Sequence, residues 1–535
     1  AAWLNESPKR SKRRPHLTRL LQHLWRQRPD LQRIFPDPAG DDLSDFSAWA
    51  LDYGRHEFTL DDAFLATLAR PSRADLFTLK GIRRRLINRA KRLWNGKLGL
   101  RARELAKRLL GHRRTAAIRR ATKGDDAPVA VASPSVRPVT PTTIDRFGVN
   151  VIGYLRAETG MGQAARALVR ALETTDVPVA SYDLDLNVLA RRDDTSVTGS
   201  LQAADTTADP EDDESLPYDI NLLVVNADQV AAVREHLGAE AFADRWTIGY
   251  WLWELELFPE RFWGAFDHLH EVWTASTFCL DAMSAVAPIP MRRMPIPVTL
   301  AAGSERFTRA DFDLDDDVFV VLFLFNFLSY GARKNPLAAV QAFRQAFAGR
   351  DDVLLVLKSA HADFAPEARE ALDREGADVN VRLIDRYMDR AEIDGLIRCS
   401  DVYLSLHRSE GFGLTVAEAM AAGKPVVATQ YGGVTDFFNA ANGYPIAYEL
   451  ITLEEDEGPY PAGARWADPD IDLAARRLRQ IHDDRDQAQR LASHARADID
   501  RELSYATIGR QIADHMHRVA RRIEHQRLGP GLPSR

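Results

Sequence analysis

Short runs of apolar, β-branched residues alternate with amphipathic helical stretches from Phe147 to near the end of the chain. Such alternation is typical of βαβ units and predicts parallel sheets covered by helices. The runs form two series, which are separated by a polar segment at 303–317. The predicted strands are 148–154, 179–184, 220–225, 246–251 and 271–274, then 318–325, 353–357, 380–384, 402–405 and 425–428. Two doubly wound units of similar size predict a ligand cleft beyond the carboxyl ends of their strands.

The N-terminal part of the chain has a different pattern, because its first 123 residues are basic and helix-like. A Pro-, Ala- and Thr-containing stretch without apolar periodicity follows and predicts a linker. The expected segments are a helical basic extension (1–123), the linker (124–145), an N-terminal Rossmann-like domain (146–305), a C-terminal Rossmann-like domain (306–490), and a C-terminal helix with a tail (491–535). We expect this last helix to cross back to the first domain.

Composition narrows the class of protein. The 535 residues are 45% hydrophobic and 27% charged, and the net charge is -7, so the whole chain is not a nucleic-acid-binding polycation. Two distant cysteines, Cys279 and Cys399, cannot form a disulfide framework, which fits a reducing cytoplasm. The basic start of the chain is followed by no apolar core of a signal peptide. The longest apolar run, 318–328, is too short to span a bilayer.

The strongest chemical signal is the segment SEGFGLTVAEAMAAGKP at 409–425. It predicts a glycine-bearing loop after a strand, then a helix that begins near Leu414. Gly411 and Gly413 permit close approach of a ligand to the backbone. The free N–H groups and the positive dipole end of the helix suit a diphosphate. Glu410 and Glu418 flank this anion site, and their carboxylates can accept hydrogen bonds from sugar and ribose hydroxyls.

This segment resembles the E-x7-E motif of retaining glycosyltransferases of the GT4 family, which have the GT-B fold. The resemblance implies that Glu410 faces the hydroxyls of the donor sugar as a catalytic residue and that Glu418 binds the ribose of the nucleotide. It also implies that the loop and helix start contact the donor. These further donor-binding residues are Gly411, Phe412, Gly413, Leu414 and Thr415.

A basic turn, Arg333 and Lys334, follows the first predicted strand of the second series. By the same resemblance these two cations hold the leaving diphosphate, where fixed charge stabilises the breaking glycosidic bond. Lys334 matches the family's lysine. The family's preceding arginine position holds Leu328 or a neighbour here, so Arg333 takes over that role. The alternative is a solvated basic turn. Gly432 and Gly433 resemble the family's glycine-rich, phosphate-side loop.

A second glycine pair, Gly160 and Gly162, resembles the dinucleotide fingerprint G-x-G-x-x-A, with Asp183 about twenty residues further on. Taken alone, this pattern indicates an NAD enzyme. However, the loop from Tyr154 to Gly160 is long for the tight turn that a pyrophosphate needs. Because the family has a glycine-rich loop here, we interpret both glycines as donor-binding residues that line the cleft. A plain turn before a helix is the alternative.

Three residues at predicted strand ends are candidates for the acceptor side: Trp253, Glu254 and Lys358. An indole can stack on a sugar face, and a carboxylate can contact acceptor hydroxyls. The alternatives are aromatic packing and an exposed lysine. Asp183 and Asp185 form a D-x-D pattern, but GT-B enzymes generally need no metal. We therefore expect neither a metal nor a cofactor.

The basic stretch 83–123 carries leucines at partly helical spacing and one acid, Glu104. Such a helix can lie on an anionic membrane surface, and no nucleic-acid recognition module accompanies it. The resulting hypothesis is a cytoplasmic retaining glycosyltransferase, peripheral at the inner face of the membrane. It would transfer a sugar from a nucleotide-diphosphate donor to a glycan or lipid-linked acceptor in cell-surface polysaccharide synthesis.

Two alternatives stay open from the sequence. One is a nucleotide-sugar epimerase or an NAD-using enzyme on a similar fold, which consumption of donor without acceptor or stabilisation by NAD would favour. The other is a non-catalytic nucleotide-sugar-binding subunit, which would bind donor and transfer nothing.

Overall fold

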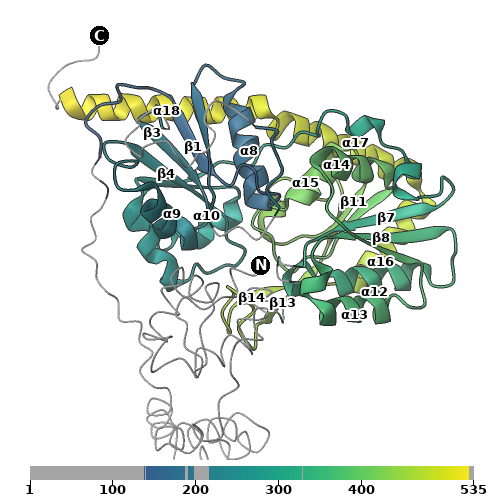
Figure 1. The fold of residues 1–535 in the computed structure, drawn as a ribbon. Coiled ribbons are helices and arrows are strands. Elements are labelled where there is room, and N and C mark those ends of the chain that lie inside the picture. Colours follow the sequence, from purple (N-terminus) through teal and green to yellow (C-terminus); the bar gives the residue numbers. More distant parts are fainter. Residues whose placement is uncertain are drawn as a thin grey trace, which may run out of the picture. The chain divides into compact units, whose positions relative to one another are not determined.

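The computed structural model describes residues 138, 140–186, 191–197, 216–327, 329 and 331–528. They contain two six-stranded parallel sheets, each covered by helices (Figure 1). The predicted α/β class with two Rossmann-like domains is therefore confirmed. The predicted basic extension (1–123) lies outside the described residues, as does most of the linker (124–145).

The first sheet has the strand order β2-β1-β3-β4-β5-β6. Its strands are β1 (Val149–Gly153), β2 (Val179–Asp183), β3 (Ile220–Val224), β4 (Trp246–Trp251), β5 (Glu271–Thr274) and β6 (Met291–Arg293). Its α-helices are α8 (Gly160–Leu172), α9 (Val230–Leu237) and α10 (Thr277–Ser284). Every residue of β1, β3 and β4 is buried, as expected where helices cover both faces of a parallel sheet.

The second sheet has the strand order β12-β11-β10-β7-β8-β9. Its strands are β7 (Phe319–Leu324), β8 (Val353–Ser359), β9 (Val381–Asp385), β10 (Val402–Ser405), β11 (Val426–Thr429) and β12 (Tyr444–Ile446). Its helices are α11 (Gly331–Lys334), α12 (Pro336–Phe347), α13 (Pro366–Glu375), α14 (Arg390–Cys399), α15 (Leu414–Ala421) and α16 (Ile471–Asp483). All ten predicted strands are present. The prediction missed β6 and β12, because three residues are too few to show a period.

A two-stranded antiparallel hairpin, β13 (Tyr448–Thr452) and β14 (Arg465–Pro469), is inserted between β12 and α16. The sequence did not predict it. All residues of β13 are exposed, whereas Trp466 and Ala467 of β14 are buried. The hairpin therefore has only one packed strand, and its sequence lacks the alternation that marks a half-buried strand.

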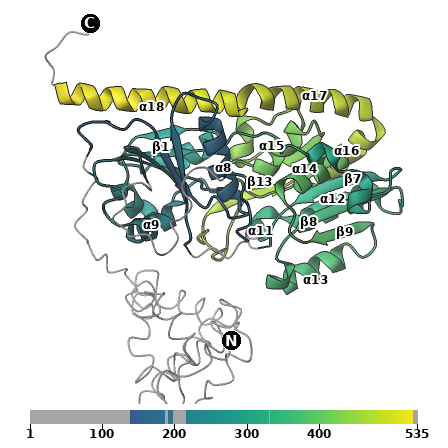
Figure 2. The same ribbon diagram turned by 45° about the horizontal axis from the view of Figure 1, so that its top comes forward.

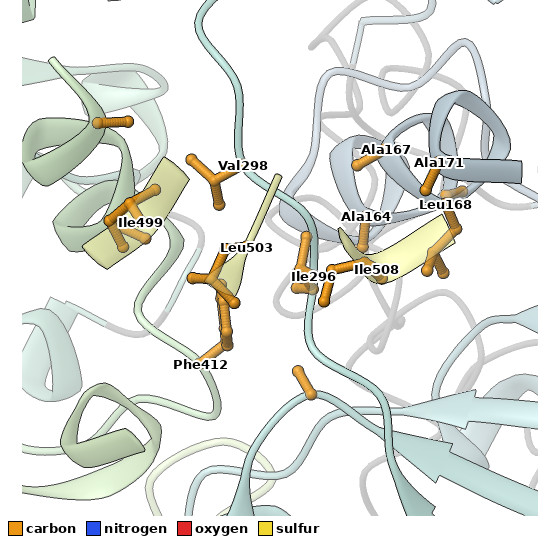
Figure 3. Packing of buried hydrophobic residues seen from close by; sticks show 14 of the residues in the cluster. Ala164, Ala167, Leu168, Ala171, Ile296, Val298, Phe412, Ile499, Leu503 and Ile508 are labelled. Atoms are coloured by element: carbon orange, nitrogen blue, oxygen red, sulfur yellow. The ribbon is translucent and has the colours of Figure 1, made fainter. Parts of the chain in front are cut away.

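Two long helices, α17 (Arg485–Glu502) and α18 (Tyr505–Leu528), end the described chain. α17 packs on α15 of the second domain and α18 packs on α8 of the first (Figure 2). Between them, the Leu503 carbonyl accepts a hydrogen bond from the backbone N–H of Val298 at 2.7 Å. Within α18, Ile508 lies beside Ala164 of α8 (Figure 3). These helices therefore join the cores of the two domains. None of the described helices combines the length and the low polarity that a bilayer crossing requires.

Candidate active site

A cavity of about 1420 Å³ lies at the carboxyl ends of the two sheets. Its wall contains residues of both domains, as expected for doubly wound sheets, which bind ligands at this edge. Most of the predicted site residues line it. They are Glu410, Arg333, Lys334, Glu418, Gly411, Phe412, Gly413, Leu414, Thr415, Gly160, Glu254 and Lys358. The structure thus brings together groups that are up to 258 positions apart in the sequence (160 to 418).

Glu410 lies at the centre of the cationic part of this wall. Its Oε1 is 2.5 Å from Lys334 Nζ, and its Oε2 is 3.2 Å from Arg333 Nη1. Burial raises the pKa of Glu410, but Lys334 and Arg333 more than offset this effect and hold the pKa at about 2. The Glu410 carboxylate is therefore ionised throughout the neutral range.

Arg333 and Lys334 sit on α11, a single helical turn rather than the loop that the sequence predicted. The turn is anchored on both sides. The backbone N–H of Arg408 donates to the Arg333 carbonyl at 2.8 Å, and Asn335 Nδ2 donates to the Leu406 carbonyl at 3.0 Å. Asn335 itself has the left-handed φ of 56°, which an asparagine tolerates better than most residues. This backbone conformation orients both cations toward the cavity.

Arg333 is 6% exposed, and its Nη1 donates to the Ser409 carbonyl at 2.8 Å. Its Nε is a buried donor without a hydrogen-bond partner among the described residues. A buried, unpartnered guanidinium donor costs free energy in the folded protein.

Helix α15 begins at the cavity with its amide groups uncapped. Gly413 precedes it with a left-handed φ of 88°, and no side chain accepts a hydrogen bond from its first turn. A Cβ on Gly413 would also lie 2.2 Å from Val434 Cγ1. Glycine is therefore required here, and the exposed N–H groups of the first turn favour an anion.

Gly432 and Gly433 do not line the cavity in the described structure. They lie beneath the 409–413 loop, where Gly433 N donates to the Glu410 carbonyl at 2.7 Å. A Cβ on Gly433 would lie 2.1 Å from the Gly411 carbonyl oxygen. Their observed role is to let two backbone segments pack closely, so the structure does not show the contact predicted for them with a donor.

Glu418 lies on α15, is 3% exposed, and pairs with Arg390 at the start of α14. Arg390 Nη1 is 2.5 Å from Glu418 Oε1, and Arg390 Nε donates to Asp394 Oδ2 at 3.1 Å. Asp394 is fully buried and also accepts the backbone N–H of Ala301 at 2.8 Å. Burial raises the pKa of Glu418 to about 7, although Arg390 opposes the shift. Glu418 is thus a carboxyl group that titrates in the physiological range.

The first-domain glycines take different positions. Gly160 lines the cavity, whereas Gly162 is buried inside the loop that precedes α8. Gly162 N donates to Thr159 Oγ1 at 3.0 Å, and a Cβ at this position would lie 2.2 Å from the Ala157 carbonyl oxygen. The predicted cleft-lining role of Gly162 is therefore wrong, because its missing side chain accommodates the chain's own backbone.

Trp253 and Glu254 point in different directions after β4. Trp253 is 5% exposed and packs among aromatic rings, with ring centroids 5.8 Å from Phe258 and 5.7 Å from Tyr460. It does not line the cavity, so the predicted stacking on an acceptor sugar is not what the structure shows. Glu254 does line the cavity, and its Oε2 accepts the Tyr460 hydroxyl at 3.1 Å.

Lys358 is the penultimate residue of β8 and lines the cavity, and its ammonium group donates to two backbone carbonyls. These are Ser359 O at 2.6 Å and Arg386 O at 2.7 Å. Burial lowers the pKa of Lys358 to about 8, with a weaker opposing effect of Asp385. Lys358 therefore orders the β8–β9 edge of the site, and it is not the exposed lysine that the alternative interpretation proposed.

The D-x-D pair is held by a cation of its own domain. Arg192 Nη2 is 2.6 Å from Asp183 Oδ2, and Arg192 Nη1 also contacts Asp185. The backbone N–H of Arg156 donates to Asp183 Oδ1 at 3.0 Å. Among the described residues, no cluster of three or more metal-ligating side chains occurs.

Sequence reasoning missed several residues of the cavity wall, above all Arg390, and Asn226, Asp228 and Gln229 after β3. Arg390 had a weak signal, since it is a charged residue just beyond a predicted strand. Its pairing with Glu418 spans 28 positions and two helices, so no local pattern reports it.

Two facing parallel α/β domains with a charged cleft between their strand ends define the GT-B class of proteins. Residues 326–512 match the model of a family described as Family 4 Glycosyltransferase in conflict systems. This match extends from α11 into the start of α18 and includes Glu410, Glu418 and the cations of α11. Residues 326–512 are thus similar to a GT4 glycosyltransferase domain.

Curated relatives resemble shorter pieces of the chain. A trehalose synthase of Pyrococcus horikoshii is 39% identical over 88 residues, which are 15% of this chain and 21% of that protein. The lipopolysaccharide core biosynthesis mannosyltransferase LpsB of Rhizobium meliloti is 37% identical over 118 residues, 22% of this chain and 31% of the relative. The chain thus spans about a fifth to a third of the length of these relatives.

Among solved structures, Anabaena Alr3699/HepE in complex with UDP and glucose is similar to 70% of this chain over 100% of its own length. The sequence identity is 17% and the TM-score is 0.48.

Proposed function

We propose that this protein transfers a sugar from a nucleotide-diphosphate donor to a glycan or lipid-linked acceptor, with retention of the anomeric configuration. We further propose that the product is a cell-surface polysaccharide, that the reaction needs no metal or cofactor, and that the enzyme works in the cytoplasm at the inner face of the membrane. The basic stretch 83–123, which lies outside the described residues, would supply the membrane contact.

One observation carries the proposal: both motif carboxylates, the cation pair of α11 and the uncapped start of α15 line one cavity. A diphosphate is a ligand whose charge and oxygen atoms match both the cations of α11 and the free amides of α15. The carboxylates of Glu410 and Glu418 then remain for hydroxyl groups on either side of the phosphates. The family match and the mannosyltransferase relative support sugar transfer as the reaction.

The proposed reaction exchanges one bond at the anomeric carbon. The acceptor oxygen attacks that carbon on the face from which the diphosphate leaves, and the bond between carbon and phosphate oxygen breaks. Its electron pair stays on the phosphate oxygen, which takes the proton of the acceptor hydroxyl. Lys334 has three N–H donors, of which Glu410 occupies one, so the ammonium can also stabilise the developing phosphate charge. Glu410 would orient the donor sugar through its hydroxyls.

The first test is a thermal-shift panel of UDP-, GDP-, ADP- and dTDP-sugars on the full-length protein. We expect one nucleotide class to raise the melting temperature of the wild type. We expect Glu418→Ala to lose most of this shift, because its carboxylate would no longer hold the ribose. Transfer would then be measured with the stabilising donor in the presence of EDTA.

Glu271→Ala is the matched control, since Glu271 is a glutamate only 2% exposed that pairs with His515 outside the cavity. Glu271→Ala should lower the melting temperature and keep the donor-induced shift. A wild type that responds to no donor would contradict the proposed function. Stabilisation by NAD instead would favour the redox alternative.

A further inference from the structure

The cavity extends beyond the groups that a donor would use. At about 1420 Å³ it exceeds the range of roughly 300–1,000 Å³ that is usual for a site of one small ligand. Its first-domain wall includes the carboxyl ends of the neighbouring strands β3 and β4. These ends contribute Asn226, Asp228, Gln229 and Glu254, and none of the four is a cation.

Glu254 is the member of this group that lies next to the Glu410 loop, and its negative charge acts to raise the pKa of both Arg333 and Lys334. Ser409 Oγ donates a hydrogen bond to the Glu254 carbonyl, so this residue and the Glu410 loop are in direct contact. A Cβ on Gly411 would lie 3.3 Å from the neighbouring Trp253 carbonyl oxygen, which shows how closely the two loops approach. Glu254 is therefore the first-domain carboxylate next to the proposed site of transfer.

The inserted hairpin holds this carboxylate. Tyr460 lies in the β13–β14 connection, is 2% exposed, and donates its hydroxyl to Glu254 Oε2 at 3.1 Å. Burial and the Glu254 carboxylate both raise the pKa of Tyr460, so its hydroxyl stays a hydrogen-bond donor at neutral pH. The hydrogen bond from Tyr460 therefore helps to orient the carboxylate at the cavity wall.

Two parts of the cavity wall thus differ in charge. The α11 part presents Arg333 and Lys334, which suit an anion, whereas the carboxyl ends of β3 and β4 present the Glu254 carboxylate with Asp228 and two amides. The first-domain arginines of the wall lie elsewhere: Arg166 and Arg170 belong to α8, Arg166 pairs with Asp194, and Arg191 pairs with Glu158 and Asp193. A carboxylate accepts hydrogen bonds from O–H and N–H groups and repels phosphates and carboxylates.

We propose that Glu254, held by Tyr460 and accompanied by Asn226, Asp228 and Gln229, forms the acceptor subsite, and that this subsite selects a sugar without a negative charge near its attacking group. The inference rests on the proposed transferase function and adds the class of acceptor: a neutral or amino sugar. Glu254 accepts a hydrogen bond from the acceptor and takes no proton in the reaction. Tyr460 is a positioning residue, since it acts through Glu254.

The experiment uses the full-length protein, the donor identified by the thermal-shift panel and four acceptor probes. These are methyl glucoside, methyl glucosaminide, methyl glucuronide and glucose 6-phosphate. Transfer is measured at low ionic strength, and binding is measured by saturation-transfer NMR in the presence of the matching nucleoside diphosphate. We expect the neutral and amino probes to bind at least about tenfold more tightly than the two acidic probes.

Glu254→Gln keeps the shape of the side chain and removes its charge. It should raise the acceptor KM about tenfold, reduce the discrimination against the glucuronide by a similar factor, and change the donor KM less than twofold. Tyr460→Phe should shift the acceptor KM in the same direction by a smaller factor and add little to Glu254→Gln in the double variant. Glu256→Gln is the control, because Glu256 pairs with Arg465 at 2.8 Å and does not line the cavity.

Two results would overturn the inference. One is a preference for the glucuronide or the phosphate, or a failure of both the neutral and the amino probes to bind. The other is a Glu254→Gln variant whose acceptor discrimination equals that of the wild type. Donor binding separates these results from a failure of the function itself, since a wild type that binds and hydrolyses the donor keeps the donor half of the site.

Discussion

Two helices, α8 and α15, begin at the same cavity after glycine-bearing loops, but only the start of α8 is capped by a side chain. In the first domain, Thr159 caps α8 by accepting from Gly162 N, and the glycine lets the loop pack on its own carbonyls. In the second domain, α15 begins after Gly413 with no side-chain cap. A capped helix start is already satisfied, whereas an uncapped one offers amides to a ligand.

The cations near the two helix starts also differ in how many of their N–H donors are already bound within the protein. Around α8, Arg166 is occupied within its own domain, since it donates to the carbonyls of Leu155 and Ala157 and pairs with Asp194 at 2.9 Å. Near α15, Lys334 pairs with Glu410 through one of its three N–H donors and lines the cavity with the others available. The comparison teaches that a glycine pattern predicts a ligand site only where the helix start is uncapped and a nearby cation keeps donors beyond its ion pair.

The largest effect is expected for the cation next to Glu410. Lys334→Met should lower kcat about 10²–10³-fold, because it removes a fixed charge that would stabilise the leaving diphosphate. Steady-state transfer or donor hydrolysis would measure it. Lys424→Met, a partly buried lysine outside the cavity, is the control and should retain kcat. An equal loss in both variants would show that the effect comes from folding rather than from the site.

The two glycine loops can be compared directly by adding a methyl group to each. Gly413→Ala should lower the free energy of unfolding by about 2–4 kcal/mol, because it combines a left-handed φ with a close contact to Val434. Gly160→Ala should be neutral or stabilising by up to about 1 kcal/mol, since a Cβ there meets no atom within 4 Å. Urea unfolding measures both. Equal destabilisation would contradict the contrast between the loops.

The smallest effect is a pH dependence of donor affinity. The pKa of Glu418 is about 7, so lowering the pH from 7.5 to 6 should weaken donor binding about eightfold if the ionised form holds the ribose. The nucleotide-sugar diphosphate carries no group that titrates in this range, which makes it a better probe than the free nucleotide. Calorimetric titrations at each pH would measure the affinity, and Glu418→Gln should remove the inflection.

The raised pKa of Glu418 also determines how the stability of the folded protein changes with pH. The pKa of Glu418 is raised above its ordinary value of 4.5, so the folded protein holds this proton more tightly than the unfolded chain. The contribution of this group to stability is complete below about pH 4.5 and is lost as the pH rises through about 7. A Glu418→Gln variant should therefore gain stability relative to the wild type as the pH rises from 5 to 8. Urea unfolding at each pH measures the difference.

Much of the fold was predictable because parallel strands are buried on both faces and therefore appear as continuous apolar runs. The run at 318–325 became β7, and the run at 246–251 became β4. The predictions failed where that signal is missing. The edge strand β6 has three residues, none of them fully buried, and the hairpin strand β13 is exposed throughout.

The candidate site likewise contains residues whose roles the local sequence predicts and residues whose roles it does not. Glu410, Gly413 and Glu418 lie within nine positions, so their spacing around a helix start could be recognised without the fold. Trp253 and Glu254 are adjacent in the sequence, and either side chain could contact a sugar. Trp253 packs among aromatic rings, whereas Glu254 lines the cavity. Tyr460 of the hairpin connection contacts both side chains, so tertiary packing rather than local sequence separates their roles.

The sequence alone determined the two α/β domains, the helix start at 414 and the chemistry of its carboxylates, because these depend on local periodicity and spacing. Tertiary structure decided which charges meet: Arg390 with Glu418, Lys334 with Glu410, and Tyr460 with Glu254. Each of these pairs joins residues 28 to 206 positions apart. Contacts of that range form only when strands and helices pack, and the sequence carries no local signal of them.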